Sequence, residues 1–179
     1  MRIMSKNFAP IVTEKFTIRQ FRAEDAGDIV RNISSDKIYA GTYRIPRPYT
    51  LEIANQYIAE RLESYAADNP KSMLFVIEVD GEVVGDVGFK YVLGHKGEIV
   101  YWLADKHHGK GVVSTAAKLI CDYGFDMLGL DKIYAEIYID NIGSQKVVEK
   151  LGFHKEGEMK KHLVKNGEFK DIYYFAKFK

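Results

Sequence analysis

The spacing of hydrophobic and polar residues changes repeatedly along the chain between the period of a strand and the period of a helix. Alternation at every second position predicts strands at residues 16–21, 73–79, 83–89 and 133–139. Apolar residues spaced three and four apart predict helices at residues 23–33, 50–65, 111–128 and 141–151. A nearly continuous apolar run at residues 98–104 is typical of a central strand that is covered on both faces.

Turn and cap residues indicate where these elements begin and end. Asp80 with Gly81, and Asn166 with Gly167, favour type I′ turns, so each pair joins two antiparallel strands. The prolines within residues 42–50 exclude a helix there and predict a loop. The resulting order, β-α-α-β-β-β-α-β-α-β-β, predicts a single α/β domain over residues 1–179, with a mixed, mostly antiparallel sheet flanked by helices.

Composition and charge narrow the classes of protein to consider. The chain has 179 residues, of which 46% are hydrophobic and 28% charged, so it can bury one core. Lys and Arg number 26 and Asp and Glu 25, which gives no global field that would gather nucleic acid or an anionic membrane. No apolar run approaches the roughly 18 residues that cross a bilayer, and the N-terminus lacks the apolar segment of a signal peptide. We therefore expect neither nucleic acid nor membrane as a partner.

The single cysteine, Cys121, indicates a cellular compartment. One cysteine forms no internal disulfide and no thiolate metal cluster, which fits the reducing cytoplasm. No basic residue is placed beside it in sequence, so we expect a small buried hydrophobic side chain rather than a nucleophile.

Residues 107–113, His-His-Gly-Lys-Gly-Val-Val, lie between the apolar strand and a long predicted helix and form the best candidate site. Gly109 and Gly111 allow successive backbone N–H groups to turn toward one point, and the helix adds its positive N-terminal end. Together they predict an anion cradle that fits a diphosphate. The loop matches neither a Walker A motif nor a dinucleotide fingerprint, because Gly111 and Ser114 stand at positions that require other residues. Taken alone, the turn is equally compatible with a plain loop.

Three motifs follow one another within residues 98–157. They are Glu-Ile-Val-Tyr-Trp-Leu at 98–103, His-Gly-Lys-Gly-Val-Val at 108–113, and Asn-Ile-Gly-Ser at 141–144 followed by Glu-Lys-Leu-Gly-Phe at 149–153 and Glu-Gly at 156–157. In this order they resemble the GNAT superfamily of acyl-CoA N-acyltransferases, with its central strand, its Q/R-x-x-G-x-G/A pyrophosphate loop and its later motif. Residues 18–21, 45–50 and 84–88 extend the resemblance over nearly the whole chain, toward the branch that acetylates the N-termini of ribosomal proteins.

The resemblance implies acetyl-CoA as co-substrate and a V-shaped splay between two central strands, in which the pantetheine arm is bonded to main chain. It implies cofactor contacts from Trp102, Leu103, His108, Gly109, Lys110, Gly111, Val112, Val113 and Asn141. Core packing also explains Trp102 and Leu103, and N-capping also explains Asn141. His108 and Val113 stand where the family usually has Gln or Arg and Gly or Ala, so we expect weakened but not abolished cofactor binding.

Glu98 is the first of two catalytic residues that the resemblance implies. It occupies the position of the glutamate base in the histone-acetylating branch, and a carboxylate half-buried in a cleft would have a raised pKa. The alternative is a solvated glutamate at a strand end, with Glu136 and Asp86 as further candidates for the base. A base matters most for a lysine-like amine, because a pKa near 10.4 leaves only about one part in 2,500 uncharged at pH 7.

Ser144 is the second catalytic residue that the resemblance implies. It lies one helical turn after Asn141, where the family commonly uses a serine hydroxyl to donate to the departing thiolate. The alternative is a first-turn serine that bonds to the backbone. We expect no metal, because His107 and His108 diverge as neighbours and no third ligand lies at the usual spacing.

The leading hypothesis is transfer of an acetyl group from acetyl-CoA to a primary amine by direct attack in a ternary complex. The acceptor is a protein N-terminal α-amine, a polyamine or a small-molecule amine, and the sequence does not choose among them. The alternative hypothesis is a GNAT-shaped domain that binds acyl-CoA as a sensor or scaffold without turnover. We expect residues 40–65 and the closing hairpin to form the acceptor pocket, and the resemblance makes a homodimer possible.

Overall fold

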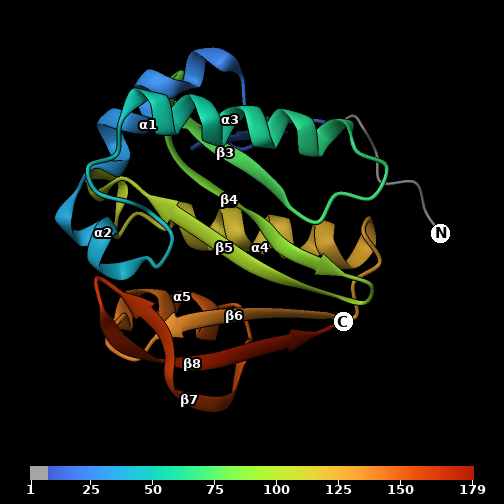
Figure 1. The fold of residues 1–179 in the computed structure, drawn as a ribbon. Helices are drawn as coiled ribbons and strands as arrows, with labels where there is room; N and C mark the ends of the chain where they lie inside the picture. The colour runs from blue at the N-terminus through green and yellow to red at the C-terminus, as the bar shows by residue number, and fades with distance from the viewer. Residues whose placement is uncertain (1–7) are drawn as a thin grey trace.

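The computed structural model describes residues 8–179, which form an eight-stranded sheet with helices on both faces (Figure 1). The strands are β1 (Ile11–Val12), β2 (Thr17–Arg19), β3 (Met73–Val79), β4 (Glu82–Leu93), β5 (Lys96–Leu103), β6 (Lys132–Tyr138), β7 (His154–Lys165) and β8 (Glu168–Phe178). The helices are α1 (Ala26–Ile33), α2 (Asp36–Gly41), α3 (Leu51–Ala66), α4 (Val112–Asp126) and α5 (Ile142–Lys150), with short 3-10 turns η1 (Ala23–Asp25) and η2 (Asp105–His107). The expectation about a signal peptide rests mainly on residues 1–7, which lie outside the described residues.

The strands are arranged in the order β1-β2-β3-β4-β5-β6-β8-β7. β5 and β6 are parallel, and every other neighbouring pair is antiparallel. This confirms the mixed, mostly antiparallel α/β sheet expected from the sequence. Both predicted type I′ turns are present, because Asp80 and Gly81, and Asn166 and Gly167, all have positive φ.

Two short elements have no counterpart in the sequence-based prediction. β1 has only two residues, too few for a periodicity to be visible. α2 begins after Ser35, whose side chain accepts a hydrogen bond from the Ile38 N–H, and its six residues are too few for an apolar stripe. The strand predicted at residues 83–89 continues to Leu93 beyond an irregularity in the ladder with β5.

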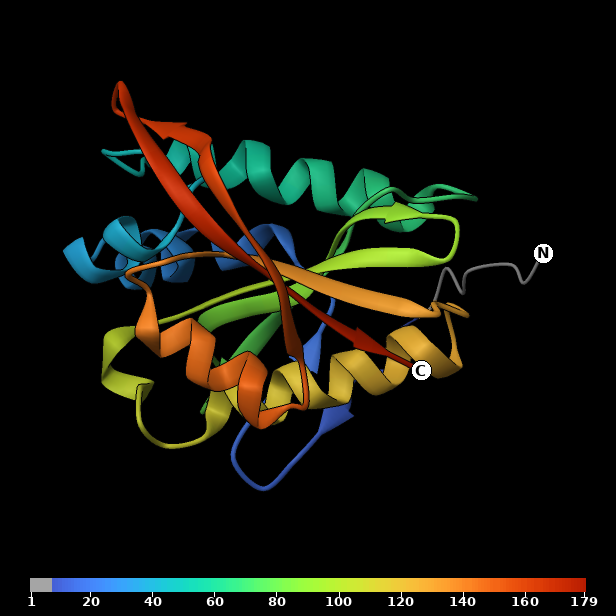
Figure 2. The same cartoon turned by 90° about the horizontal axis from the view of Figure 1, so that it is seen from below.

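The helices form two layers around the sheet, with α1 and α3 on one face and α4 and α5 on the other (Figure 2). Alternate residues of β3 face these layers: Leu74 and Val76 pack with α1 and α3, whereas Phe75 and Ile77 pack with α4. Cys121 on α4 is fully buried in the second of these cores, and burial raises the pKa of its thiol to about 12. The predicted burial of Cys121 is confirmed.

The sheet is split between β5 and β6. The two strands pair only at their starts, where Lys96, Gly97 and Glu98 lie opposite Lys132, Ile133 and Tyr134. Beyond Glu98 they diverge, although β5 continues to Leu103 and β6 to Tyr138 (Figure 1). This is the expected V-shaped splay, and it leaves the second half of β5 without a partner strand on one side.

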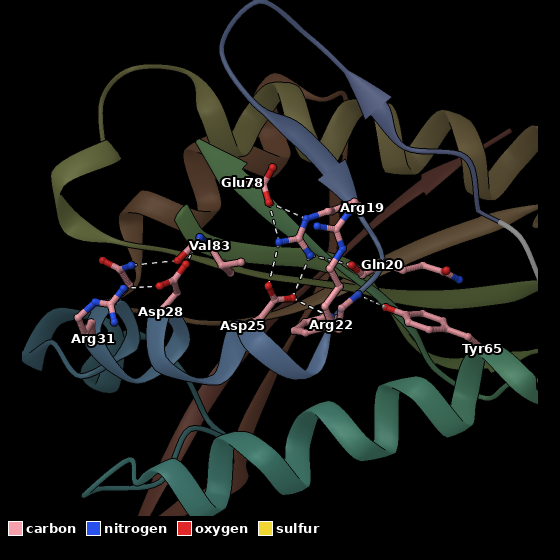
Figure 3. Close-up of polar contacts among 11 residues, drawn as sticks. Arg19, Gln20, Arg22, Asp25, Asp28, Arg31, Tyr65, Glu78 and Val83 are labelled. Atoms are coloured by element: carbon pink, nitrogen blue, oxygen red, sulfur yellow. Dashed lines mark hydrogen bonds and ion pairs between the residues drawn. The ribbon is translucent and has the colours of Figure 1, made fainter. Parts of the chain in front are cut away.

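A buried ion-pair network fixes the start of α1 on the sheet (Figure 3). The Arg19 guanidinium of β2 donates to Asp25 at 2.8 Å and to Glu78 of β3 at 2.6 Å. Arg19 and Asp25 are each 5% exposed, so removal of one partner would leave a buried charge uncompensated, at a cost of about 3–5 kcal/mol. The network therefore keeps the α1 layer in place over β2 and β3.

The β7–β8 hairpin reaches from the sheet edge to α2. Near its tip, the Lys165 ammonium donates to the carbonyl oxygens of Tyr39 and Thr42. The Tyr39 hydroxyl also donates to the Asn166 side chain at 2.9 Å. These contacts bring residues more than 100 positions apart together beside the splay.

Candidate active site

A cavity of about 420 Å³ lies between the α3 layer and the sheet and extends to the splay. Elements that are distant in sequence form its wall: α3, the loop between α2 and α3, the centres of β4 and β5, β6, and the start of α5. Of the residues proposed from the sequence, Glu98, Trp102, Asn141 and Ser144 line this cavity, as do the two further candidates for the base, Asp86 and Glu136. Leu103 and residues 108–113 do not.

Cross-strand pairs of β4 and β5 supply much of the cavity wall. Asp86 lies opposite Trp102 in the ladder, and Lys90 lies opposite Glu98. Because residues two apart share a face of the sheet, all four side chains are directed to the same side. Charged groups are thereby held inside the protein by the sheet itself.

Glu98 is 3% exposed and lies inside β5, so the alternative of a solvated strand-end carboxylate is wrong. The guanidinium of Arg44, in the loop before α3, faces it with two nitrogen–oxygen distances of 3.4 Å. Burial raises the pKa of Glu98; Arg44 opposes the rise, and Glu136 adds to it. The cavity thus contains a buried carboxylate that is more basic than an exposed one.

Asp86 is also 3% exposed. Its carboxylate accepts a hydrogen bond of 2.8 Å from the Tyr57 hydroxyl and another from the Trp102 side chain. Burial raises the pKa of Asp86 to about 6 despite these hydrogen bonds. Glu136 is closer to solvent, and one of its oxygens lies 3.7 Å from His162 Nε2.

The loop before α4 has the geometry of an anion cradle. Gly109 and Gly111 have φ of +73° and +78°, which favour glycine, and a Cβ atom at either position would meet nothing within 4 Å. The first backbone N–H groups of α4 follow directly, with positive φ at Gly111 as N-cap. The loop therefore offers open space next to backbone donors, which fits the pyrophosphate of a CoA thioester.

The side chains around the cradle point elsewhere. His108 Nε2 lies 2.8 Å from the carbonyl oxygen of Leu103, which ties the loop to the end of β5. Val112 is buried, and Val113 packs against the same core. Lys110 is exposed. The branched side chain of Val113 is therefore accommodated by the core rather than by the loop.

Trp102 and Leu103 pack in different cores. Trp102 belongs to the cluster beneath α1 and α3, whereas Leu103 belongs to the cluster beneath α4. Both are less than 10% exposed, so core packing accounts for both side chains. The group that remains available to a ligand is the main chain of β5 in the splay, as the resemblance implies.

Asn141 and Ser144 lie at the start of α5. The Asn141 side chain accepts a hydrogen bond from the Ser144 N–H at 3.1 Å and donates to the Gly41 carbonyl at 3.0 Å. Asn141 is therefore the predicted N-cap, and it also joins α5 to α2. Ser144 is half-buried and lines the cavity, and the role of its hydroxyl as a donor to the thiolate stays a prediction.

Several cavity residues received no individual role from the sequence, namely Arg44, Tyr57, Arg61, Lys90 and Tyr101, although the first three lie within the predicted acceptor region, residues 40–65. Tyr101 is next to the predicted Trp102, and its hydroxyl donates to the Ser144 carbonyl at 3.3 Å. Alternation along β4 places Lys90 on the face of Asp86, and this signal was available. For Arg44 and Arg61 the sequence carried no such signal.

Among residues 8–179, no group of three or more His, Cys, Asp or Glu side chains is arranged to hold a metal ion. No helix in the same range has the length and apolar character needed to span a bilayer.

The split sheet, the glycine cradle at the start of α4 and the buried polar cavity together define an N-acetyltransferase that uses acetyl-CoA. A family model described as "Acetyltransferase (GNAT) domain" matches residues 15–154, and the chain belongs to this family.

The relatives agree with this assignment. The probable N-acetyltransferase YjcK of Bacillus subtilis is 35% identical over 126 residues, which cover 69% of this chain and 70% of YjcK. The L-amino acid N-acetyltransferase AaaT of Escherichia coli is 28% identical over 92% of this chain and 99% of its own length. The crystal structure of the ribosomal-protein-S5-alanine acetyltransferase from Vibrio fischeri superposes with a TM-score of 0.83 and 26% identity, covering 96% and 97% of the two chains.

Proposed function

We propose that this protein transfers the acetyl group of acetyl-CoA directly to an uncharged primary amine bound in the 420 Å³ cavity. The observation that carries the proposal is the buried carboxylate of Glu98, which lines this cavity on β5 where the splay from β6 begins. A carboxylate with a raised pKa at that position is suited to accept the proton of an attacking amine. Acetyl-CoA supplies the thioester and the thiolate leaving group.

The main chain binds the co-substrate in this proposal. The backbone N–H groups from Gly109 to Val113 hold the pyrophosphate, and the unpaired edge of β5 beside Trp102 and Leu103 holds the pantetheine arm. His108, Lys110 and Val112 contribute through the loop that they build, and Asn141 orients the start of α5. Because these contacts use few side chains, the departures at His108 and Val113 are tolerated.

Glu98 acts as the general base. It takes the proton from the acceptor ammonium directly or through one water molecule, which generates the nucleophile inside the site. The guanidinium of Arg44 contacts the same carboxylate at 3.4 Å, so it must give way when an amine occupies the position in front of Glu98. Asp86 and Glu136 are the alternatives that the cavity offers for this role.

The Ser144 hydroxyl donates a hydrogen bond to the departing thiolate. The residue is half-buried and lines the cavity, which supports this role. A donor that acts on the leaving group stabilises the transition state more than the bound thioester.

The acceptor is a protein N-terminus, a polyamine or a small-molecule amine. Two of the relatives described above are named for an L-amino acid and for the alanine of a ribosomal protein. Residues 41–61 and α5 line the cavity, and the β7–β8 hairpin adjoins its α2 edge. We place the enzyme in the cytoplasm, acting as one domain over residues 1–179, with a homodimer as the assembly to test.

The test is a purified protein incubated with acetyl-CoA and a panel of amines. CoA thiol release together with acetylated product, identified by mass, is the expected result. Binding of acetyl-CoA without product from any amine would contradict the proposal and support an acyl-CoA sensor or scaffold instead.

A further inference from the structure

The charged groups of the cavity differ in how well their hydrogen-bonding capacity is used. All four carboxylates have a partner: Glu98 faces Arg44, Asp86 accepts from Tyr57, Glu60 accepts from Arg61, and Glu136 lies near His162. Of the three cations, Arg61 has two buried donors, Nε and Nη1, without an acceptor. The unused capacity of this cavity is therefore that of hydrogen-bond donors with positive charge.

Arg61 shows this most clearly. It projects from α3 toward the sheet and is 7% exposed. Its Nη2 donates to Glu60 at 2.8 Å, but its Nε and Nη1 are buried without any hydrogen-bond partner. Because an unpaired buried donor is costly, an orphaned guanidinium on a cavity wall indicates a group that is supplied from outside the chain.

Two further contacts hold the Arg61 guanidinium at the cavity. It lies over the ring of Tyr57, 4.4 Å from the ring centre, which orients it without using its N–H groups. Glu60 is about half exposed, so solvent weakens this ion pair. The charge of Arg61 is therefore only partly compensated on the cavity side.

Lys90 is the second cation of the anchor. Its side chain is half-buried on β4, lines the cavity and lies opposite Glu98 in the ladder. Burial lowers the pKa of Lys90, and the guanidinium groups of Arg44 and Arg61 lower it further, while Asp86 and Glu98 oppose them. An anion beside Lys90 would relieve this unfavourable arrangement.

The ladder sets these charges close to the proposed base. Lys90 of β4 lies directly opposite Glu98 of β5, and both line the cavity, as does Arg61 of α3. The thioester is expected in the splay, so the acceptor amine approaches Glu98. A carboxylate on the carbon next to that amine would then lie beside Lys90.

We propose that Arg61 and Lys90 form an anion anchor, and that the preferred acceptor is a small amine that also bears a carboxylate, such as a free amino acid. The inference rests on the proposed function, because it assigns the carboxylate of the acceptor whose amine faces Glu98. It distinguishes among the acceptors, since a polyamine has no carboxylate and a protein N-terminus has none next to its amine. Aliphatic and aromatic residues between the charges, including Ile53, Leu74 and Tyr49, suit an apolar side chain.

The experiment compares acceptors that differ only in the carboxylate. L-Leucine, L-methionine and L-phenylalanine are each measured against the corresponding primary amide, with spermidine and a peptide N-terminus as further acceptors. Rates are expressed per concentration of uncharged amine, because a neighbouring carboxylate raises the pKa of the amine. We expect kcat/KM for the acids to exceed that for the amides by about tenfold to a hundredfold.

Variants then test the two residues. Arg61→Gln and Lys90→Gln should each bring the ratio of acid to amide toward one, whereas Lys15→Gln, in the exposed turn between β1 and β2, should leave the ratio unchanged. Lys90→Gln changes a half-buried residue and decides the test if Arg61→Gln does not fold. Equal rates for acids and amides in the wild type, or an unchanged ratio in Lys90→Gln and in any folded Arg61 variant, would overturn the anchor.

Failure of the anchor and failure of the proposed function have different signatures. Acetylation of amides, spermidine or peptide without preference for acids leaves the enzyme assignment intact and removes the anchor. If no amine is acetylated, calorimetric titration of acid and amide into the CoA-saturated protein still tests the anchor. Tighter binding of the acid that is lost in Lys90→Gln supports it, and equal or absent binding of the acid refutes it.

Discussion

The glycine loop proposed to hold pyrophosphate, called the cradle here, and the cavity proposed to hold the acceptor are built in different ways. The cradle is a continuous segment, residues 108–113, whose working groups are backbone N–H donors around Gly109 and Gly111. The cavity is assembled from α3, β4, β5, β6, α5 and a loop, and its working groups are charged side chains. One site depends on local backbone geometry, and the other depends on the whole fold.

This difference has a consequence for how each site responds to mutation. A main-chain site tolerates exchange of its side chains, provided that the loop keeps its positive φ angles and its open space. A side-chain site holds buried charges at an energetic cost, and a single substitution changes its chemistry. The four predictions below test this contrast, from the largest expected effect to the smallest.

Glu98→Gln should have the largest effect on turnover. The amide keeps the shape of the side chain but accepts no proton, so we expect kcat to fall by about 10²–10⁴-fold near neutral pH. Burial raises the pKa of Glu98, and the wild-type rate should therefore decline as the pH falls through that raised pKa. In the variant this dependence should vanish, and part of the rate should return at high pH as the amine loses its proton unaided. A pH–rate profile of both proteins measures this.

Glu63→Gln is the matched control, because Glu63 is exposed on α3 and does not line the cavity. It should retain the wild-type profile. Near-normal turnover of Glu98→Gln at pH 7, with a profile parallel to wild type, would assign the base to Asp86 or Glu136 instead. The size of the defect also reports on the acceptor, since a lysine-like amine depends on a base more than an α-amine does.

Gly111→Glu should abolish binding of CoA at the cradle. A carboxylate next to the α4 N-terminus would occupy the position of the pyrophosphate and repel it. The wild type should gain about 2.7 kcal/mol of stability when CoA is present at a hundred times its dissociation constant, and the variant should gain almost none. Thermal unfolding with and without CoA gives both values.

Gly129→Glu provides the control for backbone strain. Gly129 has φ of +69°, and its Cβ position is equally open, but it follows the other end of α4. Each substitution forces a side chain into left-handed geometry at a cost of about 1–2 kcal/mol, so both variants should melt earlier without ligand. Only Gly111→Glu should lose the shift with CoA. A full CoA shift in Gly111→Glu would place the cofactor elsewhere.

The same contrast explains how far the sequence could predict this structure. The cradle was suggested by a local pattern, because two glycines before an apolar helix permit positive φ and leave N–H groups free; the resemblance then favoured a cradle over a plain loop. Turns and strand alternation are also local, which is why both type I′ turns and the two faces of β3 were predictable. The position of the splay was predicted from the resemblance alone. The parallel pairing stops after Glu98, but this does not change the hydrophobic periodicity of either strand, so the pattern does not reveal it.

The acceptor cavity was predictable only in part. Glu98 was proposed from its motif, but its ion-pair partner Arg44 lies 54 positions earlier in a loop where periodicity carries no signal. Arg61 stands on a helix whose other buried residues are apolar, and a charged residue in that pattern favours the solvated face. Its buried position results from the layer packing of α3 on β3 and β4, a long-range feature that one sequence alone does not reveal.

Ser144→Ala should lower kcat by about tenfold with little change in the affinity for acetyl-CoA. A hydrogen bond to a developing thiolate is charge-assisted, and its loss affects the transition state more than the bound thioester. Ser34→Ala is a suitable comparison, because the Ser34 hydroxyl donates to the Val30 carbonyl at 2.7 Å and does not line the cavity. Turnover equal to wild type, measured by steady-state kinetics, would remove Ser144 from the mechanism.

Asp86→Asn should leave the fold unchanged and raise the free energy of unfolding at neutral pH by about 1–2 kcal/mol. The pKa of Asp86 is held at about 6 by burial, whereas the ordinary value is 3.8. A carboxyl group whose pKa is raised by folding binds its proton more tightly in the folded state, so folding loses stability as the pH rises from about 4 to 6. The full loss is about 3 kcal/mol at neutral pH. An asparagine avoids it but forfeits one hydrogen bond, worth about 1 kcal/mol.

Urea unfolding of the ligand-free wild type and Asp86→Asn at pH 4 to 8 tests this directly. The difference in unfolding free energy should grow in favour of the variant between about pH 4 and 6 and then remain constant. The opposite trend, with the wild type gaining stability as Asp86 ionises, would show that Arg61 and Lys90 already hold this carboxylate as their counter-ion. Asp86 would then already neutralise Arg61 and Lys90. The α3 side of the acceptor cavity would not attract an acceptor carboxylate. The sign of this small pH dependence therefore decides whether the cavity is preorganised for an anion.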